Sequence, residues 1–142
     1  MSKTRRRIFR AVLLIFWMGV IYYFSDQANS NACTEEIFGT GNYFARKLAH
    51  VTEYAILCLF FYLFFSDCAS LLPDKASSPA SGREPLKALA LCLLCSFLYA
   101  CGDEWHQSFV PGRSALFSDV LIDTSGALTA ALALFFKKQK IT

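Results

Sequence analysis

The sequence predicts an all-α integral membrane protein, with four transmembrane helices in a compact bundle and both termini in the cytoplasm. Hydrophobic residues make up 55% of its 142 residues and charged residues only 18%, whereas soluble domains average about 45–50% and ~25%. The apolar residues form four long runs, and a helix needs about 20 residues to cross the hydrocarbon core. The runs lack the alternation that is typical of membrane β-barrels.

We expect the whole chain, residues 1–142, to form a single membrane domain. The segment at residues 67–85 is rich in Pro, Ser and Gly, a composition that is typical of linkers. It is therefore predicted to be a flexible cytoplasmic loop between the second and third runs. The four predicted transmembrane helices cover residues 8–24, 48–65, 86–102 and 116–136.

The basic residues predict the orientation. Eleven of the fourteen Lys and Arg residues flank the helix ends on the side of the two termini, and Arg46, Lys47 and Arg113 flank the other ends. Because cytoplasmic loops carry an excess of Lys and Arg, we expect both termini on the cytoplasmic side. The chain is thus predicted to be a multi-pass protein of the cytoplasmic (inner) membrane. The net charge is only +3 and no basic stripe is present, so we expect no nucleic-acid partner.

Polar residues gather at the outer ends of the predicted helices. Lys47, His50 and Tyr54 share one helical face, and Asp119 and Asp123 share another. An acidic or basic residue inside a membrane costs at least ~2.5–3.5 kcal/mol on insertion scales. These side chains should therefore face one another, or a ligand, in a common outward-facing cavity.

Acids outnumber bases around this predicted cavity. Glu53, Asp103, Glu104, Asp119 and Asp123 stand against Lys47 and Arg113. Either some carboxyl groups are protonated or a cation joins them. A purely structural network, in which Lys47 and Arg113 pair with the acids, is the alternative to a ligand site.

The residue types suggest separate roles. Carboxyl and imidazole groups can transfer protons, so the candidate catalytic residues are His50, Asp103 and Glu104. Arg113 follows a Pro-Gly pair and could grip a phosphate or carboxylate in a bidentate manner. The candidate substrate-binding residues are Gln27, Lys47, Tyr54, Gln107, Arg113, Asp119 and Asp123. We expect no metal and no cofactor, because no His or Cys spacing supports a zinc site.

At these residues the chain resembles the VanZ-like family of bacterial membrane proteins. The resemblance is carried by Phe24-Ser25-x-Gln27, by Lys47-x-x-His50-x-x-x-Tyr54, and by Asp103-Glu104-x-x-Gln107-x-Phe109-x-Pro111-Gly112-Arg113 with Asp119 and Gly126. It implies a four-helix inner-membrane fold and an association with low-level resistance to the glycopeptide antibiotic teicoplanin. Asp123 stands where the family more often has Asn.

Three functions remain open at this point. The leading hypothesis is that the site acts on, or binds, an anionic lipid-linked or cell-envelope precursor, with Arg113 and Lys47 holding the anion. The alternative is a non-enzymatic protein that binds or shields a lipid or a glycopeptide antibiotic. A small ion-coupled carrier is the third. The expected partners are membrane lipids, and both oligomeric state and enzymatic activity are left open.

Overall fold

In the computed structural model, residues 2–28, 39–69, 83–113 and 115–139 are described, and they form helices without strands. The helices are α1 (Lys3–Ser25), α3 (Asn42–Ala69), α4 (Arg83–Gln107) and α5 (Phe117–Gln139), with a short 3-10 turn, η1 (Gly39–Gly41), before α3. The all-helical prediction is confirmed. Most of the predicted loop at 67–85 lies outside the described residues.

Most helix ends extend beyond the predicted apolar runs. For example, α1 begins at Lys3 rather than at residue 8, and α3 begins at Asn42 rather than at residue 48. The extensions contain polar and basic residues, and Ser2 caps α1 by accepting a hydrogen bond from the Arg5 amide at 3.3 Å. Polar helix ends continue the backbone hydrogen-bond ladder outside the hydrocarbon, which an apolar pattern does not register.

All four helices are long and apolar enough to cross a membrane. Large apolar side chains remain exposed on the outside of the bundle, such as Phe16 at 64% and Leu98 at 59%. Exposed apolar area on this scale is unusual for a soluble monomer and normal where lipid is the solvent. The chain is therefore a multi-pass membrane protein.

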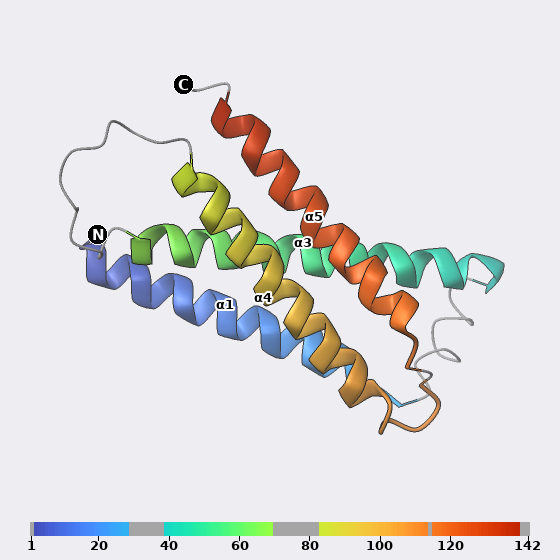
Figure 1. Cartoon of the computed structure of the whole chain (residues 1–142). Coiled ribbons are helices and arrows are strands. Elements are labelled where there is room, and N and C mark those ends of the chain that lie inside the picture. Colours follow the sequence, from blue (N-terminus) through green and yellow to red (C-terminus); the bar gives the residue numbers. More distant parts are fainter. Residues whose placement is uncertain (1, 29–38, 70–82, 114, 140–142) are drawn as a thin grey trace.

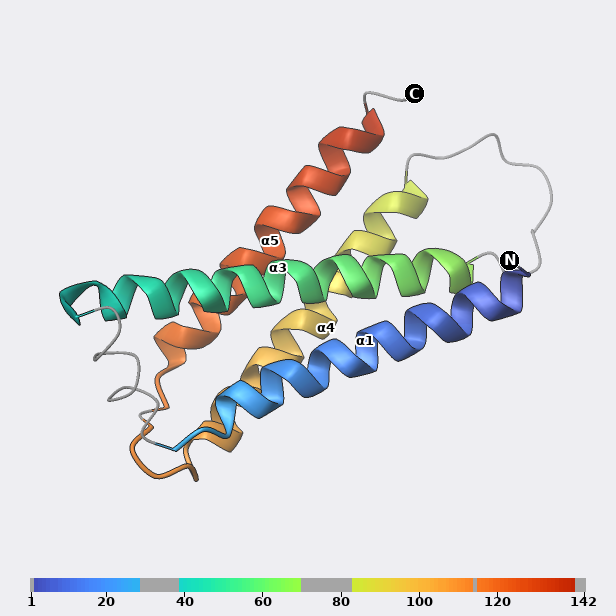
Figure 2. The same cartoon turned by 180° about the vertical axis from the view of Figure 1, so that it is seen from behind.

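The helices cross as two layers, with α1 and α3 on one side and α4 and α5 on the other (Figure 1). The start of α1 and the end of α5 lie at the same end of the bundle. Figures 1 and 2 both show α1 and α3 close together near the N-terminus and diverging toward the opposite end. The most extensive contacts join α3 to α5, whereas α1 contacts α3 and the end of α4.

Close backbone packing joins α3 to α5. Gly126 of α5 lies against the backbone of Val51, so that a Cβ atom there would overlap the Val51 carbonyl group. Buried alanines continue the same contact at Ala127, Ala130 and Ala131. Small residues let membrane helices approach each other closely, and this contact fixes the spacing at which side chains of α3 and α5 can meet.

Side-chain donors attach α1 to its neighbours at three depths. Arg10 Nη1 donates to the Leu63 carbonyl at 2.8 Å, and Trp17 Nε1 donates to the Glu53 carbonyl at 2.9 Å. On the other side, the Tyr99 hydroxyl of α4 donates to the Met18 carbonyl at 2.6 Å. These bonds hold α1 in place although few of its residues are buried.

Substituting Gly126→Ala should destabilise the bundle. The added methyl group would collide with backbone rather than with a flexible side chain, and overpacking of this kind costs ~1–3 kcal/mol. Gly102→Ala is the matched control, because nothing lies within 4 Å of the added atom there. Thermal unfolding in detergent should show a lower Tm for Gly126→Ala alone. Equal Tm values for the two variants would contradict the close contact.

Candidate functional site

The polar residues converge at the end of the bundle opposite the termini. A cavity of about 250 Å³ lies there, and its polar wall residues include Asn42, Arg46, Lys47, His50, Gln107, Arg113 and Asp119. They come from the start of α3, the end of α4, the loop that follows it and the start of α5. The structure thus brings together side chains from distant parts of the chain, as the predicted common cavity requires.

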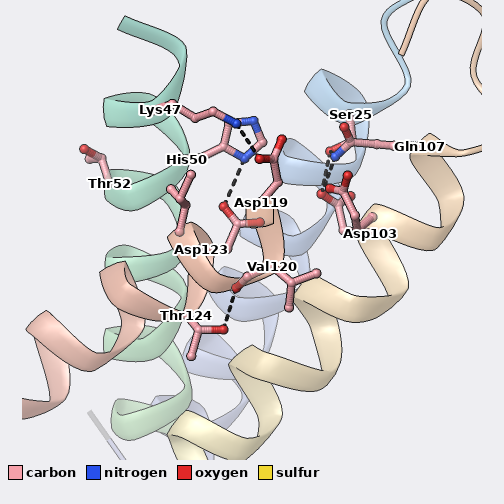
Figure 3. A network of polar contacts seen from close by, with 12 residues as sticks. Ser25, Lys47, His50, Thr52, Asp103, Gln107, Asp119, Val120, Asp123 and Thr124 are labelled. Carbon is pink, nitrogen blue, oxygen red and sulfur yellow. Dashed lines mark hydrogen bonds and ion pairs between the residues drawn. The ribbon is translucent and has the colours of Figure 1, made fainter. Parts of the chain in front are cut away.

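Two side-chain pairs join α3 to α5 in this region (Figure 3). Lys47 Nζ lies 2.5 Å from Asp119 Oδ1, and His50 Nδ1 lies 3.0 Å from Asp123 Oδ1. The two helices run in the same direction from this end, so successive turns of one face successive turns of the other. Asp123 is only 1% exposed, whereas His50 is 16% exposed and lines the cavity.

A second buried network joins α1 to α4. The Asp103 carboxylate accepts hydrogen bonds from Ser25 Oγ at 2.8 Å and from Gln107 Nε2 at 3.0 Å. All three side chains are buried, and Figure 3 shows them pointing toward one another. Gln107 Oε1 then accepts from Arg113 Nη1 at 3.2 Å, which extends the network to the cavity wall.

A tight turn places Arg113. Its amide donates to the Val110 carbonyl at 3.1 Å, with Pro111 and Gly112 between them. Gly112 has a φ of 77°, and Pro followed by a residue with positive φ is typical of a type II turn. The turn directs Arg113 back toward α1, where Nη2 donates to the Phe24 carbonyl at 2.5 Å.

Glu104 holds the following part of the loop. Its Oε1 accepts from the Leu116 amide at 2.6 Å, immediately before α5 begins. The carboxylate is buried and does not line the cavity. Asp119, in the first turn of α5, adds a negative charge at the positive end of the helix dipole.

The cavity wall is more basic than the sequence count suggests. It carries Arg46, Lys47 and Arg113 but only one carboxylate, Asp119, because the other acids lie behind the wall or in a neighbouring hollow. Asp119 attracts Arg46 electrostatically but is paired with Lys47. Among the described residues, no carboxylate forms an ion pair with Arg46 or Arg113. Arg46 Nη1 and Arg113 Nε are buried atoms without a hydrogen-bond partner in the described chain.

The site residues predicted from the sequence lie in three places. Lys47, His50, Gln107, Arg113 and Asp119 line the cavity. Behind the wall are Tyr54, Asp103, Glu104 and Asp123, all buried. Gln27 is not in the cavity wall; its Nε2 donates to the Tyr23 carbonyl at 3.0 Å, at the end of its own helix.

Sequence reasoning missed Arg46 as a site residue. We counted it with the basic residues that flank a helix end, although it lies four residues before His50 and hence on the same helical face. That spacing was the available signal. Glu53 was recognised as an intramembrane acid, and it lines a second hollow beside the cavity, together with Arg46, His50 and Arg113.

The two histidines have different surroundings. His106 Nε2 lies 3.4 Å from Asp26 Oδ1, and its ring lies 4.6 Å from the Tyr22 ring, away from the pair of His50 with Asp123. Within the described ranges, no group of three or more His, Cys, Asp or Glu side chains is arranged to hold a metal ion.

The His50 imidazole should carry a proton on Nδ1. An ionised Asp123 can only accept hydrogen bonds, so it selects the form of the ring that donates from Nδ1 and leaves Nε2 to the cavity. The variant His106→Gln leaves His50 as the only histidine, and nitrogen-15 NMR of its ring reports the protonated atom. A ring with Nδ1 unprotonated would contradict this assignment, and Asp123→Leu should abolish the preference.

Comparison with known proteins yields one match. The model of the family described as VanZ/LLP1 matches residues 9–138, which include all four helices almost completely. No curated protein and no solved structure matches the chain.

Proposed function

Because the chain belongs to the VanZ/LLP1 family, we propose that it binds the anionic group of a lipid-linked or cell-envelope precursor at the arginine-containing cavity. The observation that carries this proposal is the pair of arginines, Arg46 and Arg113, which line the cavity and form no ion pair with a carboxylate of the described residues.

The surroundings of these arginines favour an anionic ligand over an internal salt bridge. Arg113 is held by two neutral acceptors, the Gln107 side chain and the Phe24 carbonyl. These acceptors orient the guanidinium group without forming an ion pair with it. A charged group in a poorly hydrated site is costly unless it is paired, and phosphate or carboxylate matches the guanidinium fork with two hydrogen bonds.

The family resemblance and the charge distribution extend the proposal. We place the termini in the cytoplasm and the cavity at the outer face of the bacterial inner membrane, because basic residues are concentrated at the terminal side. Through the family, expression of the protein is expected to raise tolerance to teicoplanin. The ligand would then be an envelope component whose availability changes the response to a glycopeptide.

Removing the arginines should remove bound anionic lipid. Each charge-assisted hydrogen bond is worth ~1.5–3 kcal/mol, so Arg46→Gln and Arg113→Gln should each weaken retention at least about 10-fold. The measurement is mass spectrometry of phospholipids and lipid-linked precursors that remain with protein purified in detergent. Lys137→Gln, an exposed charge at the far end of α5, is the matched control. Equal retention by all variants would refute an anion site at these arginines.

A second candidate function is proton transfer to or from the bound ligand. His50 lines the cavity while its Nδ1 faces the buried Asp123 carboxylate, and such a pairing orients an imidazole for acid–base chemistry. The alternative is a binding or shielding protein that needs no proton transfer. The ion-coupled carrier has less support, since the ionisable residues of the cavity wall all lie at one end of the bundle.

His50→Gln separates the enzyme from the binding protein. If His50 transfers protons, the variant should keep its lipid but lose any wild-type change in envelope lipids and precursors, whereas Arg113→Gln should lose both. The measurement is an untargeted lipid and precursor comparison at matched membrane levels, with teicoplanin tolerance scored in parallel. Wild-type behaviour of His50→Gln in both assays would exclude the catalytic role and leave the binding function.

A further inference from the structure

A second hollow lies beside the cavity, between α1 and α3. It has a volume of about 280 Å³ and shares Arg46, His50 and Arg113 with the cavity. Its other wall residues include Phe24 of α1 and Ala49 and Glu53 of α3. One face of the two arginines therefore points to the cavity and another to a more apolar space.

The hollow continues into a groove on the outside of the bundle. The groove has a volume of about 420 Å³ and shares Ala49 and Glu53 with the hollow. Trp17 of α1 forms one side, and the other side is α3 from Ala45 to Ile56. The groove thus lies between α1 and α3, two helices that diverge toward the end of the bundle opposite the start of α1 in Figures 1 and 2.

The order of the side chains along this path matches the order of groups in a lipid. Cations lie at the cavity end, and apolar or small side chains lie at the groove end. Ala45, Ala49, Thr52 and Ile56 follow helical spacing along one face of α3. The small side chains of Ala45 and Ala49 leave room beside the helix, and Ala49 is exposed.

We propose that a membrane phospholipid, or the phospholipid-like part of a lipid-linked precursor, enters the site sideways from the bilayer between α1 and α3. Its phosphate lies against Arg46 and Arg113, and one hydrocarbon chain lies in the groove beside Trp17 and Ala49. This inference rests on the proposed anion site and adds the class of ligand and its path.

Two features favour a lipid over a water-soluble anion. A soluble anion would need only the polar cavity, whereas the arginines also line the second hollow, which shares Ala49 and Glu53 with the groove beyond it. The groove faces the lipid side of a membrane-spanning helix, next to the exposed Leu48 side chain. A chain in the groove replaces contacts with bulk lipid at little cost, while the phosphate gains paired cations.

Glu53 marks the junction of the two parts. It lines both the hollow and the groove, and the positive charge of Arg113 attracts its carboxylate. No hydrogen bond to this carboxylate is formed within the described residues. It is therefore an acceptor for hydroxyl or amino groups of a headgroup, at the depth where the headgroup gives way to the chain.

Trp17 provides a direct probe of the groove. The chain has two tryptophans, so Trp105→Phe leaves Trp17 as the only one. In lipid-free detergent, phosphatidylglycerol with brominated acyl chains should quench Trp17 fluorescence in a saturable manner. Ala49 and Thr52 are exposed positions in the groove. Ala49→Phe and Thr52→Phe should each raise the half-saturating lipid concentration at least about 10-fold. Ala133→Phe, an exposed alanine of α5, should leave it unchanged.

The controls separate this inference from the anion site itself. Brominated diacylglycerol, which lacks phosphate, should not saturate, and glycerol 3-phosphate should compete with the brominated lipid unless Arg46→Gln is present. If the arginine variants weaken quenching but both groove variants behave as Ala133→Phe does, the anion site stands and the lateral path is wrong. If lipids with and without phosphate quench alike and without saturation, the lipid inference is overturned, and glycerol 3-phosphate binding measured by calorimetry then decides the anion site independently.

Discussion

The pairing of ionisable side chains between α3 and α5 is the constraint on which the site depends. Lys47 with Asp119 and His50 with Asp123 meet only because the two helices run in the same direction and touch at Gly126 and Val51. An ionisable group inside a membrane protein needs a partner. Each pair therefore specifies the register of the helices as well as the chemistry of the cavity wall.

With these pairs made, the arrangement leaves positive charge at the cavity. Asp103 and Glu104 are occupied by Ser25, Gln107 and the Leu116 amide, and Asp119 is occupied by Lys47. Arg113 is aimed by the turn at Pro111-Gly112 and by two neutral acceptors, which fix its position before any ligand arrives. Preorganised donors of this kind bind an anion without first breaking a salt bridge. Asp103 and Glu104, which looked like surplus acids in the sequence, thus hold parts of the wall and of the following loop by hydrogen bonds.

The sequence predicted the fold well, because long apolar runs are a direct consequence of bilayer thickness. It also grouped Lys47, His50, Asp119 and Asp123 correctly, since helical periodicity decides which side chains share a face. It did not reveal Arg46, because an arginine at a helix end has the same pattern whether it reaches the headgroups or lines a cavity. It also could not show that Glu104 accepts from the Leu116 amide, since that contact depends on the path of the loop between α4 and α5.

The central claim is that Arg46 and Arg113 hold a phosphate-bearing headgroup. The most direct test is a crystal structure of the full chain grown from a lipid phase doped with an anionic phospholipid. The account predicts phosphate density between the two guanidinium groups, with Lys47 still paired to Asp119. An empty cavity in which both arginines have turned to form salt bridges with Glu53 or another carboxylate of the chain would contradict it.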